Sequence, residues 1–193
     1  MKTLRFLSFI FLLSSFCLNA QDIKVGDLYT FDDNTQGVVF YVDKEGHGLA
    51  VSLNQEKRRW EEESHYVYCQ NIVSITDETV PTLELNSGLG QAYTSNILMQ
   101  LGDEKPTAAK YCRQNGLDWY LPSVGEMHQL MTANANGELD KTLKENDSKT
   151  ISGWYWTSSE YGQGEAWRIS DEGKAKRCSK LATRVYARAI RQF

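Results

Sequence analysis

The stretch DWYLPSVGE (residues 118–126) decides how the C-terminal half of this chain folds. Pro122 restricts the residue before it to an extended conformation. Ser123, followed three residues later by Glu126, forms a capping box, the usual signature of a helix start. The stretch therefore predicts an extended segment that leads directly into a helix over residues 124–131.

Three further aromatic and polar motifs follow in order: YWTSSE (155–160), AWRI (166–169) and ARAIRQF (187–193). Short runs of this kind, separated by glycines, are typical of strands. With the run at residues 175–178 they predict an antiparallel sheet.

The rest of the chain predicts a hairpin and more helices. Two β-rich runs, 37–42 and 49–53, flank a polar, glycine-containing connection and indicate a β-hairpin. Apolar spacing and breakers predict helices over 89–101, 106–116 and 138–145. The order of hairpin, helices and sheet is that of an α+β domain.

The four C-terminal motifs, in this order and spacing, resemble a bacterial family. It is named after the C-terminal domain of a Legionella collagen-like protein (Lcl), and its usual form is roughly W-R/Y-L-P-x-x-x-E-L, Y-W-S-S-T/S-E, A-W and V-R-x-V-R-x-F. The hairpin GVVFYV…GLAVSL (37–53) also resembles many relatives from gut Bacteroidota. The resemblance implies a C-type-lectin-like fold and a secreted recognition module more than an enzyme.

The resemblance also implies structural roles for particular residues. Glu126, Arg188 and Arg191 match near-fixed positions of the family, which favours a partly buried pair between Glu126 and one of the two arginines. A helix cap alone would explain the glutamate locally, and a catalytic carboxylate is the third reading. Core positions are assigned to Trp119, Trp156 and Trp167.

The aromatic residues after residue 153 are the candidate contact surface. Strand alternation places Trp154 and Trp156 on one face and Tyr155 on the other. One face must be core, and the other is free to stack on a sugar or a partner protein. Residues 161–165 read as an exposed turn in the region that forms the ligand surface of lectin-like folds. The predicted ligand-binding residues are Trp154, Tyr155, Tyr161, Gln163, Glu165 and Arg168.

Several motifs are absent from the sequence. Neither the Glu-Pro-Asn or Gln-Pro-Asp loop nor the Trp-Asn-Asp strand of calcium-dependent lectins occurs, so we expect recognition without calcium. Cys178 has no neighbouring cysteine, which does not support the chemistry of formylglycine-generating enzymes. We expect no catalytic residues, no metal and no cofactor, because no hydrolase, zinc or phosphate-loop motif occurs.

The N-terminus predicts export. Lys2 and Arg5 precede an apolar run to Phe16 that is too short to span a bilayer, and Ala20 is a small residue suited to cleavage. The alternative is a lipoprotein signal at Cys17, disfavoured by the large residue before it. Residues 1–20 are thus predicted to be a signal peptide and residues 21–193 a single domain, with no membrane span.

Removal of residues 1–20, which include Cys17, leaves three cysteines: Cys69, Cys112 and Cys178. An exported protein can form a disulfide, and an odd count leaves at least one thiol outside it. We expect the first two to pair, since both lie before the C-terminal sheet, although the sequence does not fix the connectivity.

Charge is uneven along the chain. Residues 21–167 carry 11 Lys/Arg and 23 Asp/Glu, whereas residues 168–193 carry 8 and 2. The basic segment is either a patch for an anionic ligand or, as we favour, a hairpin attracted to an acidic body. Nucleic acid is not an expected partner of an exported acidic protein.

The sequence therefore predicts a non-catalytic recognition module at the cell envelope, periplasmic, surface-bound or secreted, that binds a protein or a glycan. Two alternatives remain: an enzyme that uses Glu126 or the basic C-terminal hairpin, and an accessory structural subunit of a surface assembly.

Overall fold

The computed structural model describes residues 22–62, 69, 88–102 and 106–193. Within them, seven strands form one sheet in the order β1-β2-β3-β7-β4-β5-β6. The strands are β1 (Leu28–Thr30), β2 (Gln36–Val42), β3 (Gly48–Lys57), β4 (Trp154–Glu160), β5 (Glu165–Ser170), β6 (Ala175–Ser179) and β7 (Tyr186–Gln192). Neighbours are antiparallel except β4 and β7, which are parallel. The predicted signal peptide, residues 1–20, lies outside the described residues.

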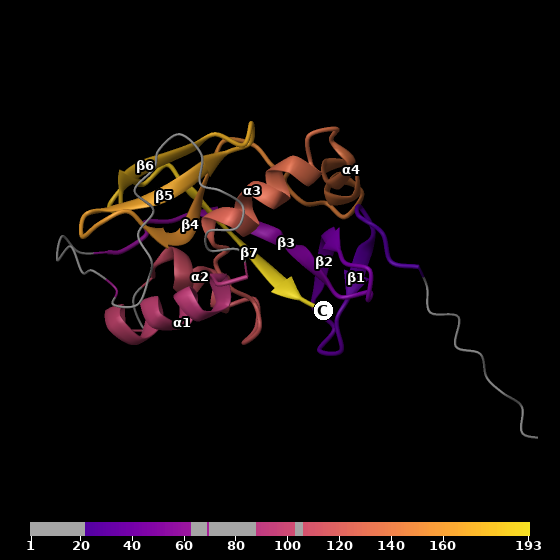
Figure 1. The fold of residues 1–193 in the computed structure, drawn as a ribbon, viewed down its shortest axis with the longest axis horizontal. Helices are drawn as coiled ribbons and strands as arrows, with labels where there is room; N and C mark the ends of the chain where they lie inside the picture. The colour runs from indigo at the N-terminus through magenta and orange to yellow at the C-terminus, as the bar shows by residue number, and fades with distance from the viewer. Residues whose placement is uncertain (1–21, 63–68, 70–87, 103–105) are drawn as a thin grey trace, which may run out of the picture.

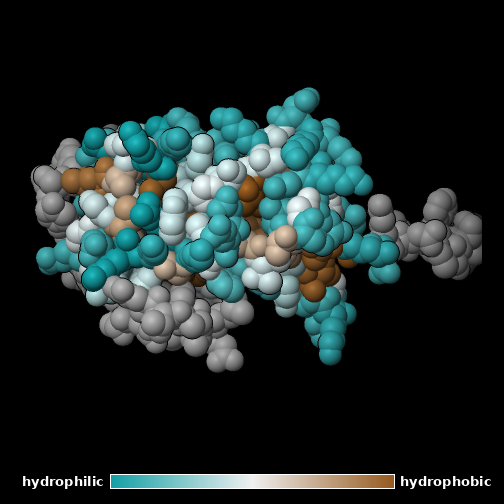
Figure 2. Space-filling model, turned by 90° about the horizontal axis from the view of Figure 1, so that it is seen from above, coloured by the Kyte–Doolittle hydropathy of each residue, from teal (hydrophilic) through white to brown (hydrophobic). Residues whose placement is uncertain are grey.

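Helices cover both faces of this sheet (Figure 1). They are α1 (Gly90–Leu101), α2 (Ala108–Arg113), α3 (Val124–Ala133) and α4 (Glu138–Glu145). The apolar residues of α1 and α2 share one buried cluster with one face of the sheet. Those of α3 and α4 share a second cluster with the other face. Seen from above, over β6, α3 and α4, the surface is mostly hydrophilic with small hydrophobic patches (Figure 2).

Strand alternation assigns each side chain to one of the two clusters. In β4, Trp156 packs with the α1–α2 cluster and Tyr155 with the α3–α4 cluster. In β5, Ala166 and Trp167 divide in the same way. A sheet that is buried on both faces needs apolar side chains at consecutive positions, and this explains the aromatic density of these strands.

The stretch of residues 118–126 connects β7, β4 and α3. Tyr120 pairs with Ile190 of β7 through two backbone hydrogen bonds of 3.0 Å. The backbone N–H of Ser158 in β4 donates to the carbonyl of Pro122 at 2.8 Å. The chain then enters α3 through the predicted capping box of Ser123 and Glu126, whose reciprocal bonds are both present. Three of the four motifs are thus held against one another, which gives them a structural role.

The predicted α+β order is confirmed in the described residues. The hairpin forms β2 and β3, the four predicted helices form α1 to α4, and the four C-terminal runs form β4 to β7. The separate antiparallel sheet expected for these four runs was wrong, because β7 pairs with β3 of the hairpin and runs parallel to β4. The first strand and the C-terminal residue also meet, because the rings of Tyr29 in β1 and Phe193 stack with centroids 4.3 Å apart.

Candidate functional site

A groove of about 540 Å³ lies where the turn between β2 and β3, the end of β7 and the start of α3 come together. Its lining consists of Tyr41, Asp43, His47, Gly48, Leu49, Gly88, Glu126, Gln129, Gln192 and Phe193. These residues combine the rings of Tyr41 and Phe193, the imidazole of His47, two side-chain amides and two carboxyl groups. None of them is a lysine or an arginine, so among the described residues the lining is neutral to acidic.

The turn of the hairpin gives the groove a fixed rim. One carboxylate oxygen of Asp43 accepts hydrogen bonds from the backbone N–H groups of Glu45 and His47, both at 2.9 Å. The backbone N–H of Asp43 donates to the carbonyl of His47 at 2.8 Å. These bonds give the turn a defined backbone shape. A register shift between Val39 and Tyr41 precedes it, and bulges of this kind re-aim nearby side chains.

Phe193 forms a second, rigid part of the wall. Its ring stacks on Tyr29 and makes an edge contact with Phe31 at 6.4 Å between centroids. It also lies directly over Gly48, where any side chain would collide with it. The absence of a side chain at Gly48 therefore allows the ring to lie against the hairpin.

Glu126 forms the buried floor of the groove, and its carboxylate has internal partners. One oxygen accepts from the backbone N–H of Ser123 at 2.7 Å, and the other accepts from the hydroxyl of Tyr120 at 3.1 Å. The backbone N–H of Gly90 is a third donor. Burial raises the pKa of Glu126 above its usual range, and these hydrogen bonds oppose the rise. The carboxylate thus ties the starts of α1 and α3 together.

The expected pair between Glu126 and a C-terminal arginine was wrong. Arg188 is fully buried, but its guanidinium donates to the carbonyls of Ser52 at 2.9 Å and Lys149 at 3.0 Å, and to the side chain of Gln55 at 2.9 Å. Ser52 lies within the stretch where the register between β3 and β7 shifts, and Lys149 lies in the segment before β4. The guanidinium of Arg188 is thus bound by uncharged oxygens and not by the carboxylate that was expected.

Arg191 binds the acidic body of the protein instead. Its guanidinium pairs with Asp33 at 2.6 Å and Asp118 at 3.1 Å, and lies over the ring of Phe31. Hydrogen bonds from Thr35, with a smaller contribution from Arg191, lower the pKa of Asp33 to about 2. These pairs agree with the expected attraction between the basic C-terminal segment and an acidic body. The expected hairpin was wrong, because β7 pairs with β3 and β4 while β6 pairs with β5 at the far edge of the sheet.

The structure places none of the six predicted contact residues in the groove. Tyr155 is completely buried, so its assignment as a contact residue was wrong. The error came from expecting one free face of the sheet, whereas helices cover both. Gln163 is exposed, and Glu165 is half-buried and lies 4.0 Å from Arg177.

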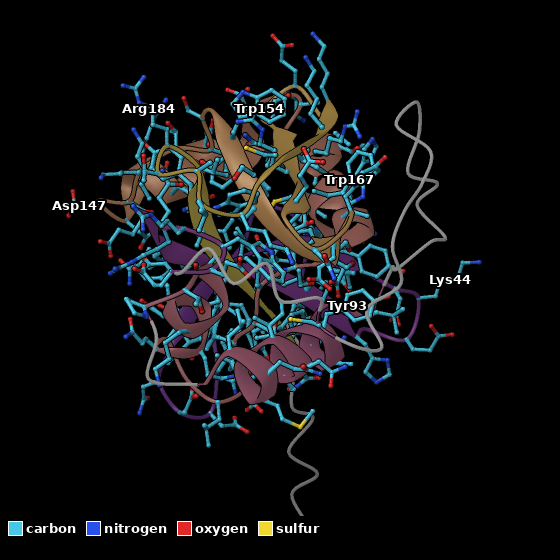
Figure 3. The ribbon with its side chains drawn as sticks, turned by 90° about the vertical axis from the view of Figure 1, so that its left-hand side faces the viewer. Lys44, Tyr93, Asp147, Trp154, Trp167 and Arg184 are labelled. Carbon is cyan, nitrogen blue, oxygen red and sulfur yellow. The ribbon has the colours of Figure 1, made fainter. Side chains whose placement is uncertain are left out.

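The two remaining predicted aromatic residues already carry cations of the same chain. The guanidinium of Arg168 lies 4.3 Å from the ring centroid of Trp154, and that of Arg177 lies 4.8 Å from the ring of Tyr161. Figure 3 shows Trp154 at one edge of the molecule, well apart from Lys44 on the turn of the hairpin. The β4–β6 edge and the groove are therefore separate surfaces.

The three tryptophans assigned to the core are buried. Trp119, Trp156 and Trp167 are at most 1% exposed. The indole N–H of Trp156 donates to the carbonyl of Arg58 at 2.8 Å, and that of Trp119 to the hydroxyl of Thr35 at 3.1 Å.

The expected disulfide between Cys69 and Cys112 does not form, and Cys178 is also a free thiol. Cys69 and Cys112 are fully buried in the α1–α2 cluster. Burial raises the pKa of Cys69 to about 12 and that of Cys112 further, so both remain protonated, unreactive thiols.

Sequence reasoning missed a buried ion pair at the end of β4. The ammonium group of Lys180 contacts the carboxylate of Glu160, and both side chains are 0% exposed. The backbone N–H of Cys69 also donates to Glu160, and the ring of Trp60 covers the ammonium at 4.4 Å. Alternation offered a signal, because Glu160 lies two and four residues after the buried Ser158 and Trp156 on the same strand.

The described residues contain no cluster of His, Cys, Asp or Glu suited to hold a metal ion. Among the same residues, no helix has the length and apolar character needed to cross a membrane.

No protein-family model and no curated protein matches the sequence. Among solved structures, the chain is similar to a fimbrial protein from Bacteroides ovatus, with a TM-score of 0.56 and 16% sequence identity. The match covers 88% of this chain and 48% of that protein, so the chain spans about half its length. At this identity the likeness is one of fold.

Proposed function

We propose that this chain is an exported, non-catalytic recognition module of the cell envelope. In this proposal its fold is a variant of the C-type-lectin-like fold, of the Lcl C-terminal type, and it binds part of a protein or a glycan without calcium. The observation that carries the proposal is the groove between the β2–β3 turn, α3 and the end of β7. It presents two aromatic rings and several hydrogen-bonding groups on a rigid frame, which is the usual composition of a recognition site.

The contacts of Glu126 favour binding over catalysis. A carboxylate with a raised pKa in a groove is a candidate general acid. Its two oxygens, however, accept bonds from Ser123, Tyr120 and Gly90, which hold two helix starts in place. A proton acceptor that is already satisfied by three internal donors is poorly placed to act on a ligand.

The second candidate function is that of an accessory structural subunit in a surface assembly. The fold likeness to a fimbrial protein favours it, and so does the predicted signal peptide. Recognition and assembly are compatible, because a module at the surface of a fibre can also carry a binding groove.

The proposal is tested by ligand capture with the exported protein. The wild type is applied to a glycan array and used to pull down proteins from envelope extracts. Tyr41→Ala removes an aromatic ring of the groove, and the matched control Tyr161→Ala removes one from the β4–β6 edge. Capture that is lost with Tyr41→Ala and kept with Tyr161→Ala is the expected result. Turnover of a captured molecule, abolished by Glu126→Gln at unchanged stability, would favour the enzyme instead.

A further inference from the structure

We propose that the groove takes an uncharged sugar ring of a glycan, an inference that rests on the proposed recognition function. The first argument is charge. Asp43 and Glu126 line the groove, and no lysine or arginine does so in the described residues. An anionic sugar would lose water on entering and would meet two carboxyl groups, one of them 3.4 Å from the imidazole of His47, and no lysine or arginine of the described lining, so the site disfavours it.

The second argument is the aromatic wall. Phe193 is fixed between Tyr29 and Gly48, while the side chain of Tyr41 is 39% exposed at the rim. A pyranose ring has faces of C–H groups, and burying them against rigid aromatic carbon is favourable without a large loss of side-chain freedom. Because the wall is in place before binding, little of this gain is spent on ordering the protein.

The third argument is the hydrogen-bonding capacity that remains. Within the described part of the chain, the amide of Gln129 and the hydroxyl of Tyr41 form no hydrogen bond. The amide of Gln192 bonds to the hydroxyl of Tyr120, which in turn donates to Glu126. Side-chain amides and hydroxyls both donate and accept, as sugar hydroxyls do. The groove therefore offers uncharged, two-way partners beside an apolar surface.

The test uses saturation-transfer NMR with the exported protein and a panel of sugars. The panel contains the neutral methyl glycosides of glucose, galactose, mannose and N-acetylglucosamine, with glucuronic acid and N-acetylneuraminic acid as charged comparators. At least one neutral glycoside should receive saturation, and the two acids should not. Tyr41→Ala and Gln129→Ala should each weaken that binding by about tenfold or more, the equivalent of one or two lost contacts.

Two further variants keep the result interpretable. Tyr41→Phe keeps the ring but removes the hydroxyl, so it should weaken binding less than Tyr41→Ala does, while Tyr161→Ala alters only the other surface and should change nothing. Thermal melts of each variant verify that the fold is intact.

Three outcomes overturn the inference: no saturation of any neutral glycoside, preference for the acids, or binding that survives Tyr41→Ala. If envelope extracts yield a protein partner that is lost with Tyr41→Ala while no neutral sugar binds, the sugar inference fails and the recognition function stands. If neither sugars nor extracts give a groove-dependent ligand, both fail.

Discussion

The groove and the β4–β6 edge differ in how their aromatic rings are used. At the edge, Arg168 and Arg177 lie on Trp154 and Tyr161, and deeper rings fill the two core clusters. In the groove, the ring of Tyr41 is 39% exposed, and no lysine or arginine of the described residues lies over it. An aromatic-rich sequence motif thus marks a well-packed part of the fold, while the surface suited to a ligand is built from residues far apart in the chain.

The largest expected effect on stability comes from removing a buried indole from the β4–β6 region. Trp156→Ala and Trp167→Ala should each lower the free energy of unfolding by about 3–5 kcal/mol, because both side chains are fully buried. Tyr161→Ala, at a half-buried ring, should cost about 1 kcal/mol. Urea melts measure all three. Equal losses would show that the edge is not organised as a core with a supporting rim.

The buried ion pair at the same end is the next largest effect. Lys180→Met leaves the carboxylate of Glu160 buried without its ammonium partner and should cost at least about 3 kcal/mol. The double variant Lys180→Met with Glu160→Gln removes both charges and should recover part of that loss. A double variant as unstable as the sum of the two single variants would contradict the pairing.

Glu126, at the floor of the groove, should have a smaller effect. Glu126→Ala removes the acceptor for the N–H groups of Ser123 and Gly90 and the hydroxyl of Tyr120, at a cost of about 2 kcal/mol. In double-mutant cycles this loss should add to that of Arg188→Ala within about 0.5 kcal/mol. A larger coupling energy would indicate a direct interaction between Glu126 and Arg188, which would contradict the contacts described above.

The pH dependence of stability tests whether the carboxylate of Glu126 is buried at the floor of the groove. Burial raises the pKa of Glu126 in the folded state, so the folded protein binds this proton more tightly than the unfolded chain. The group's contribution to stability is therefore fully present below the pKa of the unfolded chain and is lost as pH rises through the folded pKa. Between these two pKa values the free energy of unfolding falls by about 1.4 kcal/mol per pH unit. Because burial also raises the pKa of Glu160, the comparison is with Glu126→Gln. Unfolding curves from pH 4 upward should show a shallower decline in this variant, and equal declines would contradict the assignment.

Local signals in the sequence were sufficient for the elements and for part of the core. The capping box fixed the start of α3, and strand alternation assigned Trp156 and Tyr155 to opposite faces. Alternation does not reveal whether a face is covered, and this produced the error at Tyr155. That information lies in the packing of α3 and α4, which depends on long-range contacts.

The arginines and the groove were beyond local reasoning for a related cause. The partners of Arg188 are the carbonyl oxygens of Ser52 and Lys149 and the side chain of Gln55, which lie far from Arg188 in the sequence, and no local motif encodes them. The groove joins Tyr41, Gln129 and Phe193, which come together only when the sheet and α3 have formed.

The central claim is that recognition takes place in the groove and not at the β4–β6 edge. Its most direct test is an NMR titration of the isotope-labelled exported protein with the panel of neutral methyl glycosides. The account predicts concentration-dependent shifts at Tyr41, Gln129 and Phe193, with Trp154 and Tyr161 unchanged. Shifts confined to Trp154, Tyr161 and Arg168 would contradict it and return the binding surface to the edge that the sequence first indicated.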